Sequence, residues 1–421
     1  MADGILDLVD KLWNGEEEIG GPNHPLRIGS SPLEELAPGV AFTPSFANVS
    51  SFSTEDGLVL VDTGSKALAR TVHERIRAWR ADARLHTAIY SHGHIDHVFG
   101  VPVFEEEARE RGWAAPTVVA HEALPERFDR YILTAGYNGV INGRQFQAPN
   151  LRWPTDYRYP DETYRDRIDL DVGGTRFELH HAKGETDDHT WTWVPDQRVL
   201  CTGDLFIWCS PNAGNPQKVQ RYPREWAMAL REMVALHPEL LLPGHGFPIA
   251  GADRIRQALT DTADLLDSIV DQSLALMNQG ARLDELLHTV RVPEHLAARP
   301  YLQPVYDEPE FIVRNVWRLY GGWYDGNPAH LKPAPDAALA AEIASLAGGA
   351  ARLADRAQQV AASGDLRLAS HLAELAALAA PDDAGVHAVR AEVFGRRAET
   401  ERSTMSKGVF AWAARESGEK S

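Results

Sequence analysis

The chain has 421 residues, 44% of them hydrophobic, and carries 60 acidic against 42 basic side chains for a formal net charge of −18. This length and apolar content predict two or three folded domains and exclude disorder of the bulk of the chain. The negative charge opposes binding to phosphate backbones and anionic membranes, so we expect no nucleic-acid partner.

Residues 1–38 predict an N-terminal arm with one helix. Ile5, Leu8, Val9 and Leu12 follow the i, i+3, i+4, i+7 spacing of one helical face. We expect this face to pack on the body of the protein. No basic stretch precedes an apolar run, and about 18 uncharged apolar residues never follow one another, so we expect no membrane span.

The two cysteines, Cys201 and Cys209, lie in one short segment. A disulfide framework of a secreted domain would use an even set of spaced cysteines. We therefore expect a reducing compartment and place the protein in the cytoplasm.

Residues 39–252 predict an α/β domain that carries the active site. Apolar runs ending in polar or Gly-rich residues are typical of buried strands that deliver loops to one end of a sheet. These runs span residues 57–64, 86–94, 175–186, 190–194, 198–204 and 238–246, and residues 66–80 have helical character. Most runs end in a turn that contains His, Asp or Glu, and α/β enzymes build sites from such strand ends.

The segment HGHIDH carries the strongest functional signal. It holds His92, His94, Asp96 and His97 within six residues of a chain with 17 histidines. Gly93 allows a tight turn after the preceding strand, so His92 and His94 can face one point while Asp96 and His97 reach a second. Zinc binds imidazole nitrogen and carboxylate oxygen, and catalytic zinc keeps one position for water. One loop can therefore serve two metal ions.

The pattern H-x-H-x-D-H resembles the signature of the metallo-β-lactamase fold superfamily. Further candidate ligands follow in that superfamily's order within the segments Gly-Glu-Thr, Thr-Gly-Asp and Pro-Gly-His-Gly: Glu185, Asp204 and His245. The resemblance implies an αββα sandwich of the α/β class. It places His92, His94 and Glu185 on one metal, Asp96, His97 and His245 on the other, and Asp204 between them.

Glu185 narrows the resemblance, because most members of the superfamily have histidine there. A glutamate at this place is similar to the alkylsulfatase branch, although that branch commonly has a glutamate where this chain has Asp204. Two divalent ions, three carboxylates and a bridging hydroxide leave a neutral cluster, whereas histidine at position 185 would leave one positive charge. An anionic ester would then need a cationic or hydrogen-bonding cradle nearby.

Two segments offer candidates for that cradle. One follows Asp204, and we expect the other to be a loop over the site. For each candidate a role in loop or surface structure remains the alternative. The candidates are Asn212, Asn215, Lys218 and Arg221 in the first segment and Tyr137, Asn142 and Arg144 in the second.

Four side chains near the ligands have alternative roles. His180, His181 and His189 flank Glu185, and one of them could replace it as ligand. We expect Glu185 to bind because it occupies the turn after the strand, and His189 to support the ligands by hydrogen bonding. Asp62, at the end of its strand, is either a partner of a ligand histidine or an Asx-turn residue.

Residues 253–421 predict an all-helical domain. Ala- and Leu-rich periodicity covers 255–277, and 336–402 predicts helical hairpins similar to tetratricopeptide pairs without a clean 34-residue repeat. The segment at 314–333 resembles the Gly-Trp-Tyr-Asp-Gly-Asn-Pro stretch of the alkylsulfatase dimerisation domain, and 405–417 adds a weaker match. The resemblance implies a homodimer.

The expected function is metal-dependent ester hydrolysis with two zinc ions, for which manganese or iron are alternatives because of the carboxylate ligands. A bridging hydroxide is the expected nucleophile, and we assign catalytic roles to Asp96 and Asp204. The chain shows no G-x-S-x-G elbow, and Cys201 fits a buried strand. The expected substrate is a small anionic ester with an apolar tail, namely an alkyl sulfate.

Three alternatives stay open. The same centre serves many substrates on this fold, so another ester, a lactone, a thioester or a phosphodiester is a competing substrate. The aromatic residues between 191 and 323 either line an apolar pocket or form ordinary core. An iron-binding redox protein and a non-catalytic dimeric scaffold are the alternatives from other classes.

Overall fold

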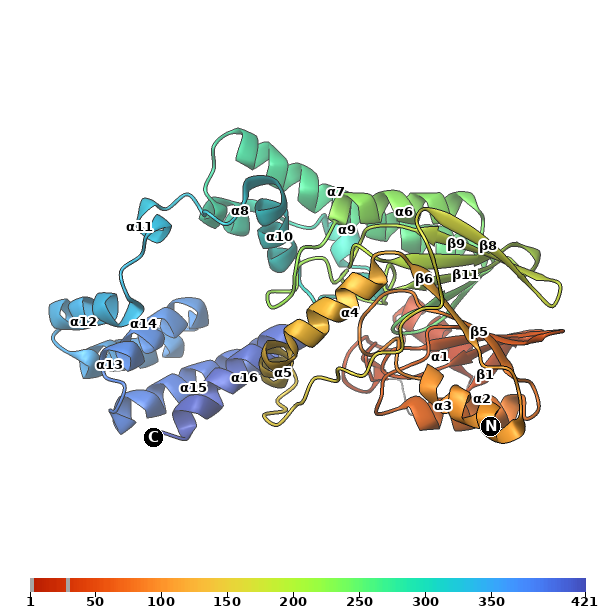
Figure 1. The fold of residues 1–421 in the computed structure, drawn as a ribbon. Coiled ribbons are helices and arrows are strands. Elements are labelled where there is room, and N and C mark those ends of the chain that lie inside the picture. Colours follow the sequence, from red (N-terminus) through yellow and green to blue (C-terminus); the bar gives the residue numbers. More distant parts are fainter. Residues whose placement is uncertain (1–3, 28–30) are drawn as a thin grey trace. The chain divides into compact units, whose positions relative to one another are not determined.

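The computed structural model describes residues 4–27 and 31–421, which divide into two compact units (Figure 1). The first unit takes in the described residues up to Ala135, then Pro154–Gly280 and Glu285–Gly321. The second comprises Gly136–Trp153, Ala281–Asp284 and Gly322–Ser421. This division differs from the predicted boundary after residue 252, because the helix that follows that residue packs on the sheets of the first unit.

The first unit contains two β-sheets. In the first sheet, antiparallel pairing leads from β1 to β4 and parallel pairing from β4 to β7. Its strands are, in spatial order, β1 (Glu34–Ala37), β2 (Val40–Thr43), β3 (Val49–Thr54), β4 (Gly57–Val61), β5 (Leu85–Ile89), β6 (Thr117–His121) and β7 (Glu162–Tyr164). All of β4 is buried, which explains its unbroken apolar sequence.

In the second sheet, β11 and β12 run parallel, and every other pair of neighbouring strands is antiparallel. Its spatial order is β13 (Ile249–Ala250), β12 (Leu240–Pro243), β11 (Val199–Gly203), β10 (Thr190–Val194), β9 (Thr175–His181) and β8 (Arg167–Val172). Phe52 on β3 meets Phe177 on β9 edge to face, with ring centroids 5.3 Å apart. The two sheets therefore pack against each other.

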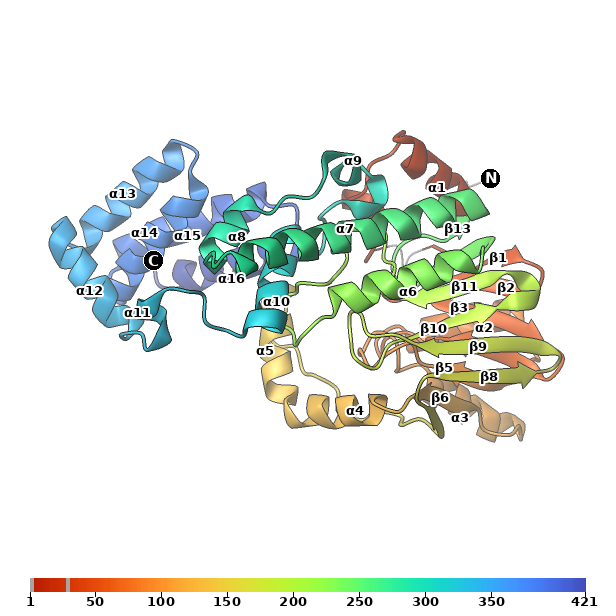
Figure 2. The ribbon, with the colours of Figure 1, turned by 90° about the horizontal axis from the view of Figure 1, so that it is seen from above.

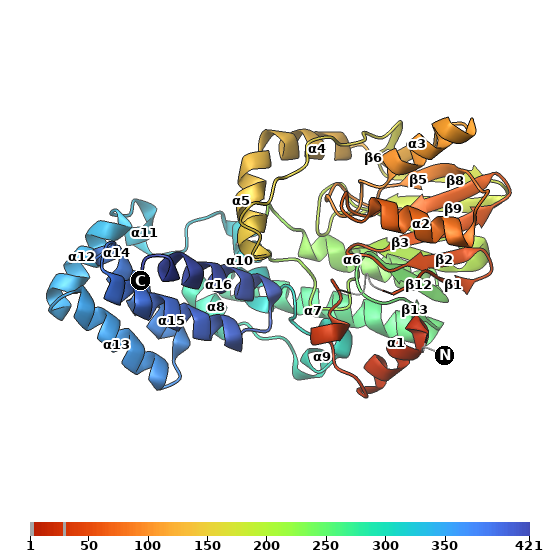
Figure 3. The ribbon, with the colours of Figure 1, turned by 90° about the horizontal axis from the view of Figure 1, so that it is seen from below.

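Helices cover the outer faces of both sheets. Figure 3 shows α2 (Ala69–Trp79) and α3 (Val101–Arg111) beside the first sheet, and Figure 2 shows α6 (Pro223–Ala235) and α7 (Ala252–Asn278) along the second. The result is the predicted αββα sandwich. The N-terminal helix α1 (Ile5–Asn14) buries the predicted positions Ile5, Val9 and Leu12.

Strand pairing brings the functional loops to one place. Val61 of β4 pairs with Ile89 of β5, so Asp62 lies beside the loop that follows β5. Cys201 of β11 pairs with Leu242 of β12, so Asp204 and His245 follow neighbouring strands in the same direction. The carboxyl ends of parallel strands share one edge of a sheet, which is where α/β folds place their sites.

Four further helices complete the first unit. They are α4 (Leu124–Leu133), most of α8 (Leu283–Thr289), α9 (Glu294–Ala297) and α10 (Pro309–Gly321). They follow the strand-rich part of the chain except for α4, which lies between β6 and β7 in the sequence.

The second unit is helical. It contains α5 (Ala135–Gln145) from residue 136 onward, α11 (Pro328–Leu331), α12 (Asp336–Ala347), α13 (Ala350–Ala362), α14 (Leu366–Ala379), α15 (Ala384–Thr400) and α16 (Thr404–Gly418). Alanines on α13 and α14 let these helices approach closely, and Ala357, Ala361, Ala369 and Ala373 form their shared core with Val393. Helices α12 to α15 are the predicted hairpins.

The predicted loop over residues 137–144 is wrong, because this segment forms α5. Two glycines inside it, Gly139 and Gly143, would each place a Cβ within 3 Å of a carbonyl oxygen of the following segment, at Leu151 and Ala148. Close packing thus requires glycine at these two positions, although glycine has a low helix propensity.

Among the described residues, no single helix has the length and apolar composition to cross a membrane. Helices α12 and α13 reach this length and composition only when taken together, and the chain bends by 83° between them.

Candidate metal centre

All seven predicted ligands lie in the first unit on four loops, each of which follows a strand. The loop after β5 carries His92, His94, Asp96 and His97, while Glu185, Asp204 and His245 follow β9, β11 and β12. His92, His97, Glu185, Asp204 and His245 are buried, and His94 and Asp96 are partly exposed. Rigid strands thus fix the loops while one side of the cluster stays open.

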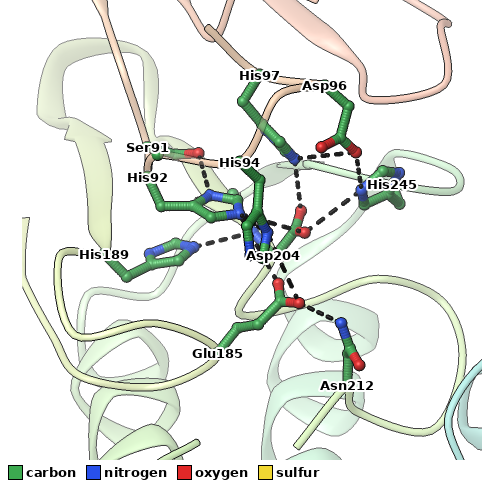
Figure 4. Close-up of polar contacts among 12 residues, drawn as sticks. Ser91, His92, His94, Asp96, His97, Glu185, His189, Asp204, Asn212 and His245 are labelled. Atoms are coloured by element: carbon green, nitrogen blue, oxygen red, sulfur yellow. Dashed lines mark hydrogen bonds and ion pairs between the residues drawn. The ribbon is translucent and has the colours of Figure 1, made fainter. Parts of the chain in front are cut away.

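These side chains form two groups in which the candidate ligand atoms lie within 4.8 Å of one another (Figure 4). The groups are His92, His94, Glu185 and Asp204, and Asp96, His97 and His245. Asp204 connects the groups, because its Oδ2 lies 3.7 Å from His92 Nε2 and 3.3 Å from His245 Nε2, and its Oδ1 lies 3.4 Å from His97 Nε2.

Several atoms that face the centre are buried without a hydrogen-bond partner among the described residues. They are His97 Nε2, Glu185 Oε2 and Asp204 Oδ1. Unpaired buried polar atoms are costly, and native proteins satisfy nearly all of them. Metal ions held by imidazole and carboxylate ligands would satisfy these atoms, so the donor set fits a metal site.

Hydrogen bonds orient the histidines from outside the centre. Asp62 Oδ2 accepts from His97 Nδ1 at 2.7 Å and from the Ser91 hydroxyl at 2.8 Å. That hydroxyl accepts in turn from His92 Nδ1 at 2.9 Å. Both rings then present Nε2 to the centre, the arrangement typical of metal-ligating histidines. Asp62, for which two roles were open, is a partner of a ligand histidine.

His189 supports the centre without joining either group of ligands. Its Nε2 accepts a hydrogen bond from the backbone N–H of Asp204 at 3.1 Å, as expected for a supporting residue. His180 stacks on Trp191 with ring centroids 4.1 Å apart, and His181 stacks on His121 at 3.7 Å. The structure therefore keeps Glu185 as the carboxylate that faces the centre from this loop.

The group around His97 and His245 has acidic surroundings. Burial by itself lowers the pKa of a histidine, but Asp204 and Asp96 raise the pKa of His245 to about 10. Asp204, Asp62 and Asp96 likewise hold the pKa of His97 well above its usual value. Burial opposes ionisation of Asp204, yet His245 and His97 keep the pKa of that carboxyl well below its usual range.

The group around His94 and Glu185 has basic surroundings. Burial, Arg221 and Arg127 lower the pKa of His94 well below its usual value. Burial and the Asp204 carboxylate raise the pKa of Glu185, and Arg221 opposes this rise. Positive charge therefore gathers on the Glu185 side of the centre.

Two of the predicted cradle residues contact Glu185 itself. Asn212 Nδ2 donates to Glu185 Oε1, and Arg221 Nη1 donates to the carbonyl oxygen of Glu185. Arg221 Nη2 also forms an ion pair with Glu185 Oε1 at 3.4 Å. Both Arg221 and Glu185 are about 1% exposed, so the guanidinium compensates a fully buried carboxylate.

The other predicted cradle residues have different surroundings. Asn215 is buried, and its Oδ1 accepts from the backbone of Gln217 at 3.1 Å. Burial and the nearby Arg221 lower the pKa of Lys218 to about 7, while Asp96 and Glu185 counteract them, so the charge of Lys218 interacts with two of the candidate ligands.

Tyr137, Asn142 and Arg144 belong to the second unit, on α5, and not to either ligand group. The Tyr137 ring is 66% exposed, and Asn142 Nδ2 is bonded to the carbonyl oxygen of Asn138 at 2.8 Å. Their proposed contact with substrate stays a prediction.

Sequence reasoning missed an ion pair that joins two of the ligand loops. Arg127 on α4 is buried and pairs with Asp188 and Asp187. Asp188 Oδ2 accepts from the backbone N–H of Gly93 at 2.9 Å, so Asp188 links the loop of Glu185 to that of His92 and His94. No local pattern marks Arg127, although an acidic pair directly after a ligand turn is a usable signal for Asp188.

The aromatic residues near the centre form core. Trp191, Phe206, Trp208 and Trp226 are at most 2% exposed. Burial also raises the pKa of the Cys201 thiol to about 12, which agrees with its predicted role as a strand residue rather than a nucleophile.

Two family models match the chain. Residues 42–245 match the metallo-beta-lactamase superfamily, and residues 282–420 match the alkyl sulfatase dimerisation domain. Together they cover most strands of the two sheets, all seven candidate ligands and most of the helices that follow.

Similar proteins include three curated sulfatases. A linear primary-alkylsulfatase of Pseudomonas sp. is 29% identical over 81% of this chain and 68% of its own length. An (R)-specific secondary-alkylsulfatase of Pseudomonas sp. is 25% identical, over 88% and 60%, and an alkyl/aryl-sulfatase of Saccharomyces cerevisiae is 25% identical, over 80% and 56%. The chain thus spans between about half and two thirds of the length of these relatives.

Among solved structures, the stereoselective inverting sec-alkylsulfatase Pisa1 from Pseudomonas sp. superposes with a TM-score of 0.83 at 24% identity. The superposition covers 92% of this chain and 65% of the other. The likeness shows that the fold is shared along nearly the whole chain.

Proposed function

Because the chain belongs to the alkylsulfatase-like branch of the metallo-β-lactamase superfamily, we propose that it is a metal-dependent hydrolase of alkyl sulfate esters. The observation that carries this proposal is the convergence of seven candidate ligand side chains, three of which have a buried atom without a hydrogen-bond partner among the described residues. Its substrate is a small sulfate monoester with an apolar tail.

The proposal includes a dinuclear zinc site, with manganese or iron as alternatives. His92, His94 and Glu185 would hold one ion, Asp96, His97 and His245 the other, and Asp204 would bind both. Bound ions supply Lewis acidity and lower the pKa of a water between them toward neutrality, so that hydroxide is available as nucleophile.

The chain's own residues prepare the reaction in two ways. Asp204 and Asp96 remain ionised, because His97 and His245 lower their pKa values against the effect of burial. Asp96 is the more exposed of the two and can accept a hydrogen bond from the attacking water, which orients it. These are the catalytic roles that we assign to Asp96 and Asp204.

Positive charge on the Glu185 side would bind the sulfate group. Arg221, Arg127 and Lys218 all lower the pKa of His94, so an anion placed near this ring meets a favourable potential. We assign Lys218 to the ester itself, because its charge acts on the partly exposed His94, with Asn215 of the same loop beside it, whereas Asn212 and Arg221 contact Glu185.

The test is sulfate release from a medium-chain alkyl sulfate by zinc-loaded protein. Asp96→Ala and a chelated sample should release none, whereas Asp253→Ala, at an exposed carboxylate on α7, should match the wild type. Release from a lactone, thioester or phosphodiester but not from the alkyl sulfate would replace the substrate while keeping the metal centre. Tightly bound iron with a redox signal and no hydrolysis would contradict the proposal.

The proposal also includes a homodimer in the cytoplasm. The match of residues 282–420 to a dimerisation domain supports the first part, and the two buried, unpaired cysteines support a reducing compartment. Sedimentation of the purified full chain tests the dimer, and fractionation of the source cells tests the location.

A further inference from the structure

Residues 210–221, part of the connection between β11 and α6, have no regular secondary structure yet touch the candidate metal centre. We call this segment the Asn212 loop. Besides Asn212 and Arg221, which contact Glu185, the next residue, Tyr222, donates its backbone N–H to the carbonyl oxygen of Gly184 at 2.9 Å. The position of Glu185 therefore depends on how the Asn212 loop is held.

A buried carboxylate holds the middle of this loop. Asp307 Oδ2 accepts from the backbone N–H groups of Gly214 at 2.6 Å and Asn215 at 3.2 Å, and its Oδ1 accepts from Glu308 at 2.7 Å. The side chain is completely buried. Burial raises the pKa of Asp307 to about 7, and the N–H groups of Gly214 and Glu308 oppose this. Asp307 thus replaces the hydrogen bonds that a regular element would supply.

A buried amide holds the end of the loop. Asn315 Oδ1 accepts from the backbone N–H of Arg221 at 3.2 Å, and Asn315 Nδ2 donates to the carbonyl oxygen of Arg221 at 3.1 Å. The same Oδ1 accepts from Gln220 Nε2 at 2.8 Å. Asn315 therefore pairs with Arg221 as a neighbouring strand would, and fixes the backbone from which the guanidinium reaches Glu185.

Helix α10 also presses directly on the loop. A Cβ at Gly214 would lie 2.2 Å from the carbonyl carbon of Phe311 and 2.3 Å from the nitrogen of Ile312. Contacts this close leave no space for a side chain, so glycine is required here. At the start of the loop, Ser210 donates its backbone N–H to the carbonyl oxygen of Gln303 at 3.0 Å.

We propose that Asp307 and Asn315 are positioning residues that hold Asn212 and Arg221 against the candidate metal ligand Glu185. The proposal rests on the proposed function for its kinetic part only. Both residues lie in the segment that matches the dimerisation model, yet they belong to the first compact unit. Part of the segment matched as a dimerisation domain would thus serve the reaction site of its own chain.

The test compares Asp307→Asn with Asp261→Asn. Asp261 is a matched control, because this carboxylate accepts from Tyr301 at 2.5 Å and Arg299 at 2.8 Å, and none of its hydrogen bonds reaches the Asn212 loop. Hydrogen exchange of the full chain, which needs neither metal nor substrate, is measured first. Asp307→Asn should speed exchange in both residues 210–221 and residues 183–189, whereas Asp261→Asn should leave both segments unchanged.

Two further readouts separate positioning from stability. In cobalt-substituted protein, the visible bands should change in Asp307→Asn but not in Asp261→Asn, since Glu185 loses support. With an alkyl sulfate, KM should rise about tenfold, the size typical of losing a residue that supports a metal ligand, with a smaller change in kcat. A wild type that hydrolyses no sulfate ester refutes the proposed function, while exchange and cobalt spectra still decide the positioning.

A second variant covers the case in which Asp307→Asn fails to fold. Asn315→Asp keeps the acceptor for Arg221 and Gln220 but removes the donor, whereas Asn315→Leu removes both. Both variants should change hydrogen exchange, the cobalt bands and KM as Asp307→Asn does, and Asn315→Asp should change them less than Asn315→Leu. If these variants lowered only the thermal midpoint, with exchange in residues 183–189, cobalt bands and KM as in the wild type, Asp307 and Asn315 would be structural residues and the proposal would be wrong.

Discussion

The two halves of the candidate metal centre use the same kinds of ligand in opposite electrostatic surroundings. Around His97 and His245, the carboxylates Asp62, Asp96 and Asp204 raise the histidine pKa values. Around His94 and Glu185, arginines lower the pKa of the histidine and oppose the rise at the carboxylate. In metal-free protein, the first half should therefore carry protons, and the second should rely on Arg221 for charge balance.

The largest loss of hydrolysis is expected from a change at Asp204, which lies where the two halves of the centre meet. Asp204→Ala removes the carboxylate that approaches His92, His97 and His245 together. Hydrolysis should fall on the order of 10³-fold or more, as for loss of a central electrostatic group. Metal analysis should show fewer than two ions per chain. An Asp204→Ala protein that keeps both ions would contradict the assignment of Asp204 as a ligand of both ions.

Arg221→Met tests the charge balance of the Glu185 half. Removal of one partner of a buried ion pair typically costs about 3–5 kcal/mol, so the metal-free protein should lose stability of that order in urea unfolding. Combination with Glu185→His, which removes the buried carboxylate, should recover much of the loss in a double-mutant cycle.

Arg224→Met is the control for Arg221→Met. Arg224 lies three residues further along the chain, in the first turn of α6, and pairs with Asp267 and Asp271 in a partly exposed position. Surface ion pairs contribute about 1 kcal/mol or less, so this variant should change stability little. Equal losses in the two variants would contradict a special role of Arg221.

Zinc binding should release protons from the half that contains His245. Because the pKa of His245 is raised to about 10, the empty site holds an imidazolium at neutral pH, and zinc must displace its proton. Zinc affinity should therefore rise as the pH rises toward 10. Calorimetry in buffers of different ionisation enthalpy measures the release, and His245→Ala should reduce it by about one proton.

The same shift predicts how the stability of the metal-free protein depends on pH. A histidine whose pKa rises on folding contributes stability that is complete below its unfolded value, near 6.5, and is lost as the pH passes its folded value. The thermal midpoint of chelated protein should thus fall between pH 6.5 and about 10, and less so in His245→Ala. A flat profile would contradict protonation of this half.

The smallest effect is expected for Asp62→Asn, which weakens support for His97 from outside the centre. The amide keeps the shape of the side chain but removes the charge that pairs with His97 Nδ1 at 2.7 Å. Loss of such a partner costs about 10-fold in metal affinity, and the loss should be larger at the ion held by His97, since Asp62 reaches His92 only through Ser91. Competition with a chelator should show one site weakened more than the other, and two equally weakened sites would contradict the division into halves.

The sequence predicted the parts of the molecule whose signals are local. Strand ends and the HGHIDH segment led to seven residues that the structure brings together, because all seven lie on loops that follow strands of the two sheets. The family and the αββα sandwich followed from the same motifs and are confirmed.

The residues that hold the ligands were largely hidden from sequence reasoning. Asp307 and Gly214 lie 93 residues apart, and Asn315 and Arg221 lie 94 apart, so only the tertiary fold reveals their pairing. Arg221 was expected in the anion cradle, but the structure shows it paired with Glu185. This pairing is likewise visible only in the tertiary fold. Helix α5, predicted as a loop, contains glycines that pack closely on residues 148–151, a contact that no sequence pattern indicates.

The second unit is built from pieces that are far apart in the chain. Gln147 Nε2, close to the end of α5, is bonded to the carbonyl oxygen of Gly408 on α16 at 2.6 Å, across 261 residues. A ribosome adds roughly 5–20 residues per second, so α5 would be made roughly 10 to 50 seconds before its partner helix. During this time the side of α5 that contacts α16, where a Cβ at Gly408 would lie 2.0 Å from the carbonyl oxygen of Gln145, has no partner helix. A nascent chain of this protein should therefore need protection from aggregation until α16 has been synthesised.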